Sequence, residues 1–400
     1  MKLIHLIRLS LVLTVIVIAM GAYTRLADAG LGCPDWPGCY GQLTVPTDKV
    51  EVQVANTLYP ERAVEQDKAW LEMIHRYLAG ALGLLVFMIT VTGIVKERHR
   101  MGLLLPLSLS VIIVFQAALG MWTVTLKLMP IVVMGHLLGG FTMFALLFFS
   151  YLRLRPSVEI DRRAEQVGAN DLSTSPQRQP FQPKVVTPNQ GIDTEPFSRQ
   201  ISASELPNSL KYLAAVALVL TIIQIMLGGW TSSNYAAVVC TSLPICEGQW
   251  FESLDFITAF TPVHFGVESY EFGVLDYAAR MTIHVTHRIG AMLVTVVVCL
   301  LIYQLMREQH KAFKRLGKGL AMMLVMQLLL GVCNVLFHLP LGIAVLHNLG
   351  AALLLLTLIK TNYVIWSARA VTRSKPKFSV IESYESISPA KASGDKERSL

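Results

Sequence analysis

Eight long apolar runs constrain this chain more than any other feature of its sequence. A helix that crosses a bilayer needs about 20 mostly apolar residues, and it satisfies its own backbone hydrogen bonds where water is absent. The chain is 53% hydrophobic and only 15% charged, against about 25% charged in ordinary domains, so a soluble enzyme, a disordered protein and a nucleic-acid binder are excluded. We expect an all-α integral membrane protein with eight spans near Leu3–Tyr23, Trp70–Val95, Gly102–Val124, Pro130–Tyr151, Leu210–Trp230, Ala279–Tyr303, Gly319–Phe337 and Leu341–Trp366.

Lysine and arginine predict the orientation of these spans, because both are enriched in cytoplasmic loops. The N-terminal segment, residues 96–100, residues 307–318 and the tail from Lys360 are basic, whereas loop 231–279 holds acidic residues and no Lys or Arg. Both termini are therefore predicted to be cytoplasmic, with loops 24–69 and 231–279 outside. The first span also fits a cleaved signal peptide ending near Ala27-Asp28-Ala29, but a matching segment in mid-chain favours a retained span.

The chain contains two copies of one pattern. Thr14–Thr24 resembles Thr221–Thr231 at an offset of 207 residues, and His75-Arg76 recurs at 287–288. Four spans in each half return the chain to its starting side, so the repeats are expected to be parallel. We predict two parallel-repeat four-helix bundles, at residues 1–155 and 210–366. A polar, disordered cytoplasmic linker at 156–209 would join them, and a cytoplasmic tail would occupy 367–400.

Four histidines lie near the outer end of the second and fourth span of each half. His75 and His136 are each about 8 Å below the outer surface, and His287 and His347 repeat them. Two imidazoles that face each other at the same depth can serve as the axial ligands of a haem in the core of a helix bundle. Each histidine could instead only hydrogen-bond a neighbouring helix, but two matched pairs favour haem, since ionisable groups inside a membrane are costly.

Two further residue types accompany these histidines. Arg76 and Arg288 follow a histidine directly, and they fit either haem propionates or the snorkelling of a long side chain at a helix end. Gln116 and Gln327 recur at matching positions, and we interpret them as structural.

The two halves differ at one acidic position. Glu72 lies one helical turn before His75 and on the same helix face, whereas its counterpart in the second half is His284. A glutamate near a helix N-terminus is also favourable for the helix dipole alone. The asymmetry nevertheless suggests that one half performs chemistry while the other holds a fixed electron carrier.

One cysteine pair lies in each outer loop, Cys33 with Cys39 and Cys240 with Cys246. Each pair encloses five residues including a proline, which favours a local disulfide that staples the loop as a lid in an oxidising compartment. A redox relay stays open, and metal binding is less favoured because only two thiols converge in each loop.

The loop segment Gly21–Gln42, the Glu72-x-x-His75-Arg76 signature and His287-Arg288 resemble haem A synthase, a family of cytochrome oxidase assembly proteins. The resemblance covers both predicted bundles. It implies an oxidoreductase that converts the C8 methyl of haem O to a formyl group through a hydroxymethyl intermediate. By similarity, His75 and His136 would hold the substrate haem iron with Glu72 near the reacting methyl, and His287 and His347 would hold the iron of haem b.

The resemblance also implies partners and a location. Haem O would be the substrate and haem O synthase (protohaem farnesyltransferase) its supplier. The electron donor is unknown, and the location would be a bacterial inner (plasma) membrane. A homo-oligomer stays open, and no nucleic-acid partner is expected. The alternatives are a transmembrane electron-transfer cytochrome with two bis-histidine haems and a haem transporter or chaperone. Both predicted histidine pairs lie near the outer face and only one half carries the acid, which favours the synthase.

Overall fold

The computed structural model describes residues 2–154, 206–248 and 250–371, and all named elements within these ranges are helices. Eight of the described helices are long and apolar enough to cross a membrane, which confirms the predicted all-α class and the number of spans. They are α1 (Leu3–Leu26), α3 (Gln66–Val95), α5 (Leu104–Thr125), α6 (Pro130–Leu154), α8 (Asn208–Ser233), α10 (Tyr277–Arg307), α11 (Lys311–Leu336) and α12 (Leu341–Val371).

Several helices extend beyond the apolar run that predicts them. α11 begins at Lys311 rather than near Gly319, because lysine and arginine are good helix formers and a helical turn outside the lipid can be basic. α5 begins two residues later than predicted, since Gly102 has a φ of +71° and ends the short helix α4 (Arg98–Met101). α12 continues to Val371, into the predicted tail, whereas most of that tail and of linker 156–209 lies outside the described residues.

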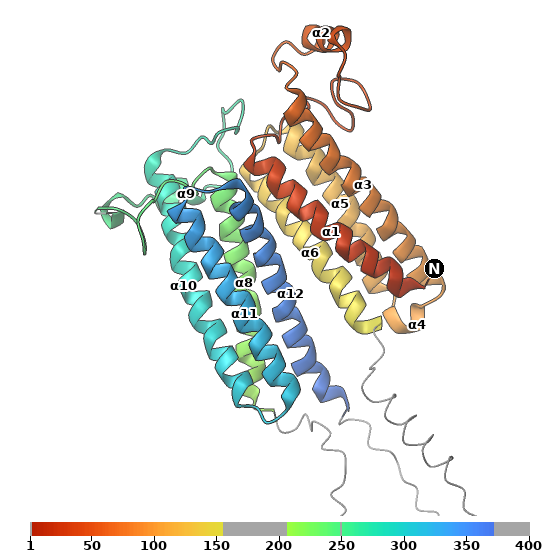
Figure 1. The fold of residues 1–400 in the computed structure, drawn as a ribbon, viewed down its shortest axis with the longest axis vertical. Helices are drawn as coiled ribbons and strands as arrows, with labels where there is room; N and C mark the ends of the chain where they lie inside the picture. Colours follow the sequence, from red (N-terminus) through yellow and green to blue (C-terminus); the bar gives the residue numbers. More distant parts are fainter. Residues whose placement is uncertain (1, 155–205, 249, 372–400) are drawn as a thin grey trace, which may run out of the picture.

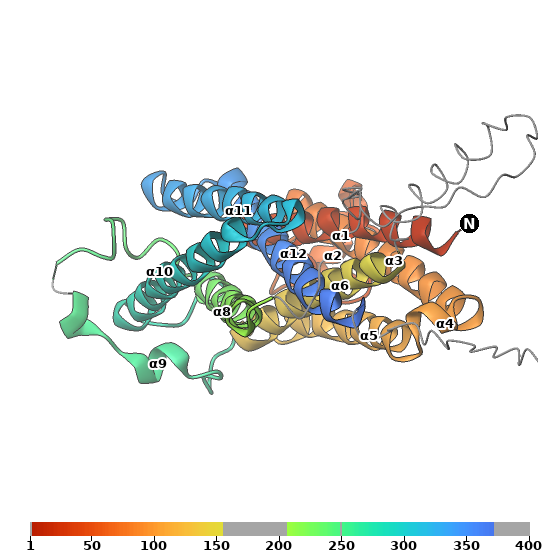
Figure 2. The ribbon, with the colours of Figure 1, turned by 90° about the horizontal axis from the view of Figure 1, so that it is seen from below.

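The helices form two groups of four (Figure 1). In the first group, α3 and α6 each contact both α1 and α5; in the second, α10 and α12 each contact both α8 and α11. The helices that carry the predicted histidines therefore lie diagonally opposite each other in each group. The groups meet through α1, α6, α8 and α12 and lie side by side when seen from below (Figure 2). These contacts fit the predicted parallel repeat, which stays a prediction.

Each group has an apolar core at one end. The first core joins the beginnings of α1 and α5 to the later turns of α3 and α6, and its fully buried members include Ile7, Val86, Leu109 and Leu147. The second core joins corresponding segments and includes Leu210, Val298, Leu320 and Leu358. Because neighbouring helices run in opposite directions, all these segments lie at the same end of the bundles. The histidines lie toward the other end, where smaller apolar clusters join the helices to the long loops.

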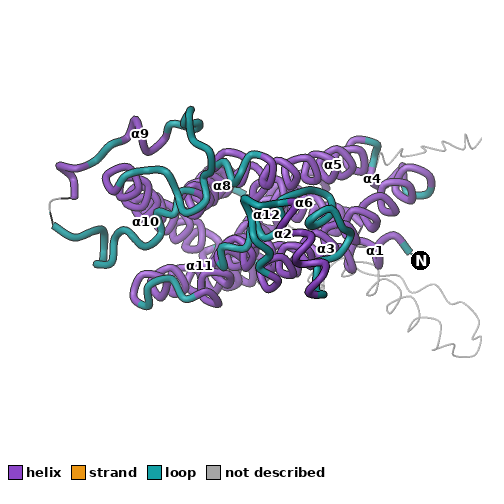
Figure 3. The backbone as a smooth tube through the Cα atoms, turned by 90° about the horizontal axis from the view of Figure 1, so that it is seen from above, coloured by secondary structure: helices purple, strands orange, loops and turns teal. Residues whose placement is uncertain are grey.

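Both long loops lie at the histidine end (Figures 1 and 3). We call it the disulfide end, because the loops contain the disulfides Cys33–Cys39 and Cys240–Cys246. The first loop carries α2 (Lys49–Leu58), and the second carries the 3-10 helix η2 (Trp250–Ser253) and α9 (Phe256–Phe260). The sequence pattern did not predict these short elements.

An ion pair joins the two loops across the groups. The guanidinium of Arg62 donates to both carboxylate oxygens of Glu271, at 2.7 and 2.9 Å. This bidentate hydrogen bonding lowers the pKa of the Glu271 carboxyl and raises the pKa of Arg62. The pair therefore fastens the loop of the second group to the loop of the first.

Candidate functional site

His75 on α3 and His136 on α6 face each other inside the first group. Their ring centroids are 6.4 Å apart and the ring planes are inclined by 83°. Two imidazoles that ligate one metal ion from opposite sides hold their centroids about 6 Å apart, given metal–nitrogen bonds of about 2 Å. The 6.4 Å between the ring centroids fits one metal ion bound by both imidazoles as axial ligands. The predicted pairing of these two residues is therefore compatible with the fold.

A glycine of a neighbouring helix backs each of the four histidine rings. A Cβ atom built on each of these glycines would lie close to the Cε1 atom of the ring, so the imidazoles rest against bare backbone. The distances are 2.8 Å for Gly21 and His75, 3.4 Å for Gly120 and His136, 3.1 Å for Gly228 and His287, and 3.2 Å for Gly331 and His347. Sequence reasoning missed this role, although the glycines themselves recur in the repeat.

The histidine rings suit a haem in a second respect. The Nδ1 atoms of His75, His136 and His347 are buried and have no hydrogen-bond partner among the described residues, although the residues themselves are only partly buried. A buried ring nitrogen without a partner is costly in free energy, which is typical of groups reserved for a ligand. The facing rings of His75 and His136 therefore fit a haem in the first group, and the unpartnered Nδ1 of His347 is compatible with one in the second. The ligand assignments stay predictions.

Glu72 lies one turn before His75 and is buried, with 5% of its surface exposed. Its Oε2 accepts a hydrogen bond from the Cys33 backbone N–H at 3.0 Å, and its Oε1 is paired with the guanidinium of Arg76. Gly32 permits this closeness, because a Cβ there would lie 2.6 Å from the backbone of α3. The carboxylate is thus held in one position by its own helix and by the disulfide loop.

Arg76 fastens the same loop to α3. Its Nη1 donates to the backbone carbonyls of Asp35 at 3.0 Å and Pro37 at 3.2 Å, and also to that of Gly38. These contacts occupy one arm of the guanidinium while Glu72 occupies the other. The predicted contact of Arg76 with a haem propionate stays a prediction.

Arg288 repeats this arrangement in the second group. It donates to the carbonyls of Cys240 at 2.7 Å and Ser242 at 2.6 Å, and to that of Ile245. Ser242 and Ile245 lie 207 residues after Asp35 and Gly38, the same offset that relates the two loops in sequence. The fourth partner differs, because the Arg288 Nε contacts the Nε2 atom of the buried His284 at 3.1 Å instead of a carboxylate.

Both predicted cysteine pairs form disulfides in the structure. Each disulfide loop also carries its own carboxylate clasp: Asp35 accepts from the backbone N–H groups of Tyr40 and Gly41 at 2.7 and 2.8 Å. Glu247 accepts from the backbone of Thr241 and Ser242, and the hydrogen bond from the Thr241 side chain contributes most to lowering its pKa to about 2. These contacts are those of a structural staple, and a redox role stays open.

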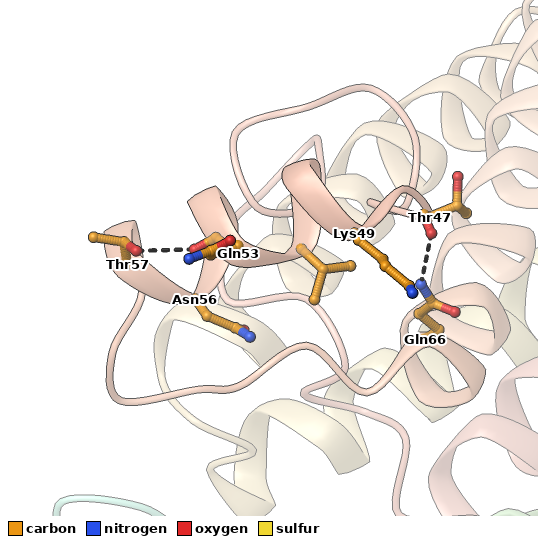
Figure 4. Close-up of a pocket in the computed structure, with 7 residues that line it drawn as sticks. Thr47, Lys49, Gln53, Asn56, Thr57 and Gln66 are labelled. Atoms are coloured by element: carbon orange, nitrogen blue, oxygen red, sulfur yellow. Dashed lines mark hydrogen bonds between the residues drawn. The ribbon is translucent and has the colours of Figure 1, made fainter.

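A polar pocket lies apart from these residues, beside α2 (Figure 4). Gln66 donates from its side chain to the carbonyl of Thr47 at 3.2 Å in the wall of this pocket. The other polar residues that line it are Lys49, Gln53, Asn56 and Thr57. None of the predicted site residues lines this pocket, so the candidate site is the histidine-bearing interior of the two groups.

The chain is similar to known proteins over most of its length. A curated protein of Shewanella oneidensis named "Heme A synthase" is 50% identical over 93% of this chain and 99% of its own length. A "Heme A synthase" of Rickettsia bellii is 23% identical over 91% of this chain and 96% of its own. One of Neorickettsia sennetsu is 28% identical over 33% of this chain and 36% of its own. The family model described as cytochrome oxidase assembly protein (COX15-CtaA) matches residues 5–175 and 189–359. The chain belongs to this family of cytochrome oxidase assembly proteins.

Proposed function

We propose that this chain is a haem A synthase, which oxidises the C8 methyl of haem O to a formyl group through a hydroxymethyl intermediate. The observation that carries the proposal is the buried Glu72 carboxylate, fixed one turn before His75 where the second group has His284. An electron-transfer cytochrome or a haem carrier needs no such fixed acid in one half. The name of the Shewanella relative supports the same activity.

The first group would be the catalytic half. His75 and His136 would bind the iron of haem O as substrate, and Glu72 would lie near the methyl group that is oxidised. The Arg76 guanidinium and the Cys33 amide hold Glu72 in place before the reaction, so little reorganisation is needed when charge develops. Glu72 would stabilise positive charge at the methyl carbon, or hold and return the protons of the hydroxyl groups.

The second group would hold haem b between His287 and His347. When bound, haem b would supply one-electron redox chemistry to the neighbouring group. Arg288 keeps the disulfide loop closed over this half through its three carbonyl contacts, which would exclude water from the cofactor. An external electron donor would reduce it, and haem O synthase would supply the substrate.

The same proposal fixes an orientation in a bacterial inner membrane. Both termini would be cytoplasmic, and the disulfide end would face the oxidising side, where disulfides persist. All four histidines lie toward this end. The arginines that follow His75 and His287 contact the disulfide loops, and His136 and His347 lie in the first two turns of α6 and α12. An electron carrier that works across the bilayer would instead place its two haems near opposite faces.

Pigment analysis tests this function. The protein is produced in cells that make haem O, purified, and its pigments are extracted and separated by chromatography. We expect haem A from the wild type and from the control Glu65→Gln, which changes an exposed acid beside the first turn of the same helix. Glu72→Gln should retain haem but form no haem A.

Two outcomes would contradict the proposal. Unchanged haem O on the wild-type protein would favour the cytochrome or the carrier. Normal haem A formation by Glu72→Gln would remove Glu72 from the mechanism.

A further inference from the structure

The short helix α9 in the second loop carries a cluster of large apolar side chains on its surface. Ile257 is 85% exposed and Phe256 is 56% exposed, and the ring of Phe260 stacks on that of Phe256. Ala259 is buried against the second group. The helix lies at the outer edge of that group, beside α10 and away from the first group (Figure 3). An exposed apolar cluster of this kind marks contact with lipid or with another protein.

Two hydrogen bonds fix the height of α9 along the second group. The backbone N–H of Asp255 donates to the Thr282 hydroxyl at 2.8 Å, and the indole N–H of Trp230 donates to the carbonyl of Ala259 at 2.8 Å. Thr282 lies five residues after the start of α10, and Trp230 lies three residues before the end of α8. α9 therefore lies beside the outer turns of these two spans and not beyond their ends.

The basic residues of α8 and α10 relate this height to a bilayer. The apolar core of a bilayer corresponds to about 20 helical residues, and each headgroup layer adds about 5 to 8 Å. Lys211 and Arg307 mark one edge of the core, at the end opposite the disulfides. About 20 residues further along each helix, the other edge lies near Trp230 and near His287. Thr282 is about 8 Å beyond that edge, so α9 lies in the headgroup layer.

The surface of α10 next to this level faces lipid. Ile289 and Leu293 lie seven and eleven residues after Thr282, on the same face of the helix. Both side chains are exposed, and exposed apolar side chains along a span contact the acyl chains. The apolar cluster of α9 therefore continues a lipid-facing surface outward, which favours lipid over a protein partner as its surroundings.

The same count places helix α2 of the first loop in water. Gln66, the first residue of α3, lies 30 residues before Lys96, so it is about 15 Å beyond the edge of the core. Its side chain donates to the carbonyl of Thr47, just before α2, at 3.2 Å. α2 stands clear of the bundle (Figure 1). Val54 on α2 is exposed like the α9 side chains, and it provides a matched control at a different height.

We propose that α9 is an interfacial anchor, which inserts Phe256, Ile257 and Phe260 into the bilayer leaflet at the disulfide end. Aromatic and aliphatic side chains are favourable at the boundary between headgroups and acyl chains. Loop 231–279 contains no Lys or Arg, so the insertion depends on apolar contact and requires no anionic lipid. The bilayer thereby fastens the second loop between its disulfide and α10. The sequence pattern alone placed this whole loop outside the membrane.

A spin label at α9 tests the anchor. The full chain carries Ile257→Cys in a background of Cys299→Ala and Cys333→Ala, which removes the two cysteines outside the disulfides. The labelled protein is placed in phosphatidylcholine vesicles, and collisions of the nitroxide with oxygen, which concentrates in lipid, and with a neutral nickel chelate, which stays in water, are measured. Leu293→Cys gives the lipid reference and Val54→Cys gives the water control. The oxygen-to-nickel ratio at position 257 should be several-fold above that at position 54 and close to that at position 293.

Two results would overturn the proposal. A ratio at position 257 equal to that at position 54 would place α9 in water, and poor access of both reagents would mean that protein, from a second copy or a partner, covers it. Hydroxyl-radical oxidation of the wild type in the same vesicles requires no substitution. After correction for intrinsic reactivity, Phe256 and Phe260 should be oxidised several-fold less than Leu58 on α2, and equal oxidation would also refute the anchor.

Discussion

Replacing the glycines behind the histidine rings should displace the rings by graded amounts. An alanine Cβ at position 21 would lie 2.8 Å from the Cε1 of His75, whereas carbon atoms pack at about 3.5 Å or more. The ring must therefore move by roughly 0.7 Å, which exceeds the tolerance of about 0.2 Å for a metal–ligand distance. The same subtraction gives the expected displacement of the other rings, which is roughly 0.4 Å for Gly228→Ala, 0.3 Å for Gly331→Ala and 0.1 Å for Gly120→Ala.

The assay is the low-spin haem spectrum of each purified variant, with haem content per protein. We expect Gly21→Ala to lose the first-group haem, Gly228→Ala and Gly331→Ala to weaken the second-group haem, and Gly120→Ala to resemble the wild type. Gly80→Ala is the matched control on α3, because a Cβ there would meet no atom within 4 Å. Helix stability cannot explain a loss, since alanine favours helix over glycine by about 1 kcal/mol.

The reasoning fails if Gly21→Ala binds haem as well as Gly80→Ala does. It also fails if Gly120→Ala has a larger effect than Gly21→Ala. Either result would mean that the four rings do not rest against these backbones when haem is bound.

The remaining predictions concern the disulfide end. Replacing Cys33 and Cys39 together by serine should destabilise the loop by about 2 kcal/mol through lost chain restriction, seen as faster proteolysis; abolished haem A formation with an undigested loop would instead indicate a redox role. Because the Arg62 hydrogen bond lowers the pKa of Glu271 below the ordinary 4.5, the contribution of this pair to stability is complete above that value and is lost as pH falls toward the lower folded pKa. On acidification in detergent, the free energy of unfolding should therefore fall by about 1 kcal/mol more in the wild type than in Arg62→Gln. Equal decreases in the two proteins would refute the linkage. Gly32→Ala should detach the first loop from α3, since its Cβ would lie 2.6 Å from backbone that cannot move aside, and unchanged protease resistance would contradict this.

Local patterns in the sequence determined the spans and the candidate residues. Eight apolar runs gave eight helices, because lipid contact requires apolar side chains along a whole span, and the structure contains all eight. The two cysteines of each pair are six residues apart in the sequence, so the chain itself keeps them close, and both disulfides are present. The histidines and Glu72 could be selected because polar groups inside an apolar run are rare.

Only the tertiary structure decided which groups touch. Arg76 and Arg288 bind carbonyls of the disulfide loops, and the sequence could not show this because every backbone residue offers a carbonyl. Arg62 and Glu271 meet across 209 positions of sequence, which no periodic pattern relates. The contact of Gln224 with His287 depends on how α8 packs against α10. The packing of helices and loops in three dimensions brings these distant groups together, and local sequence patterns do not determine that packing.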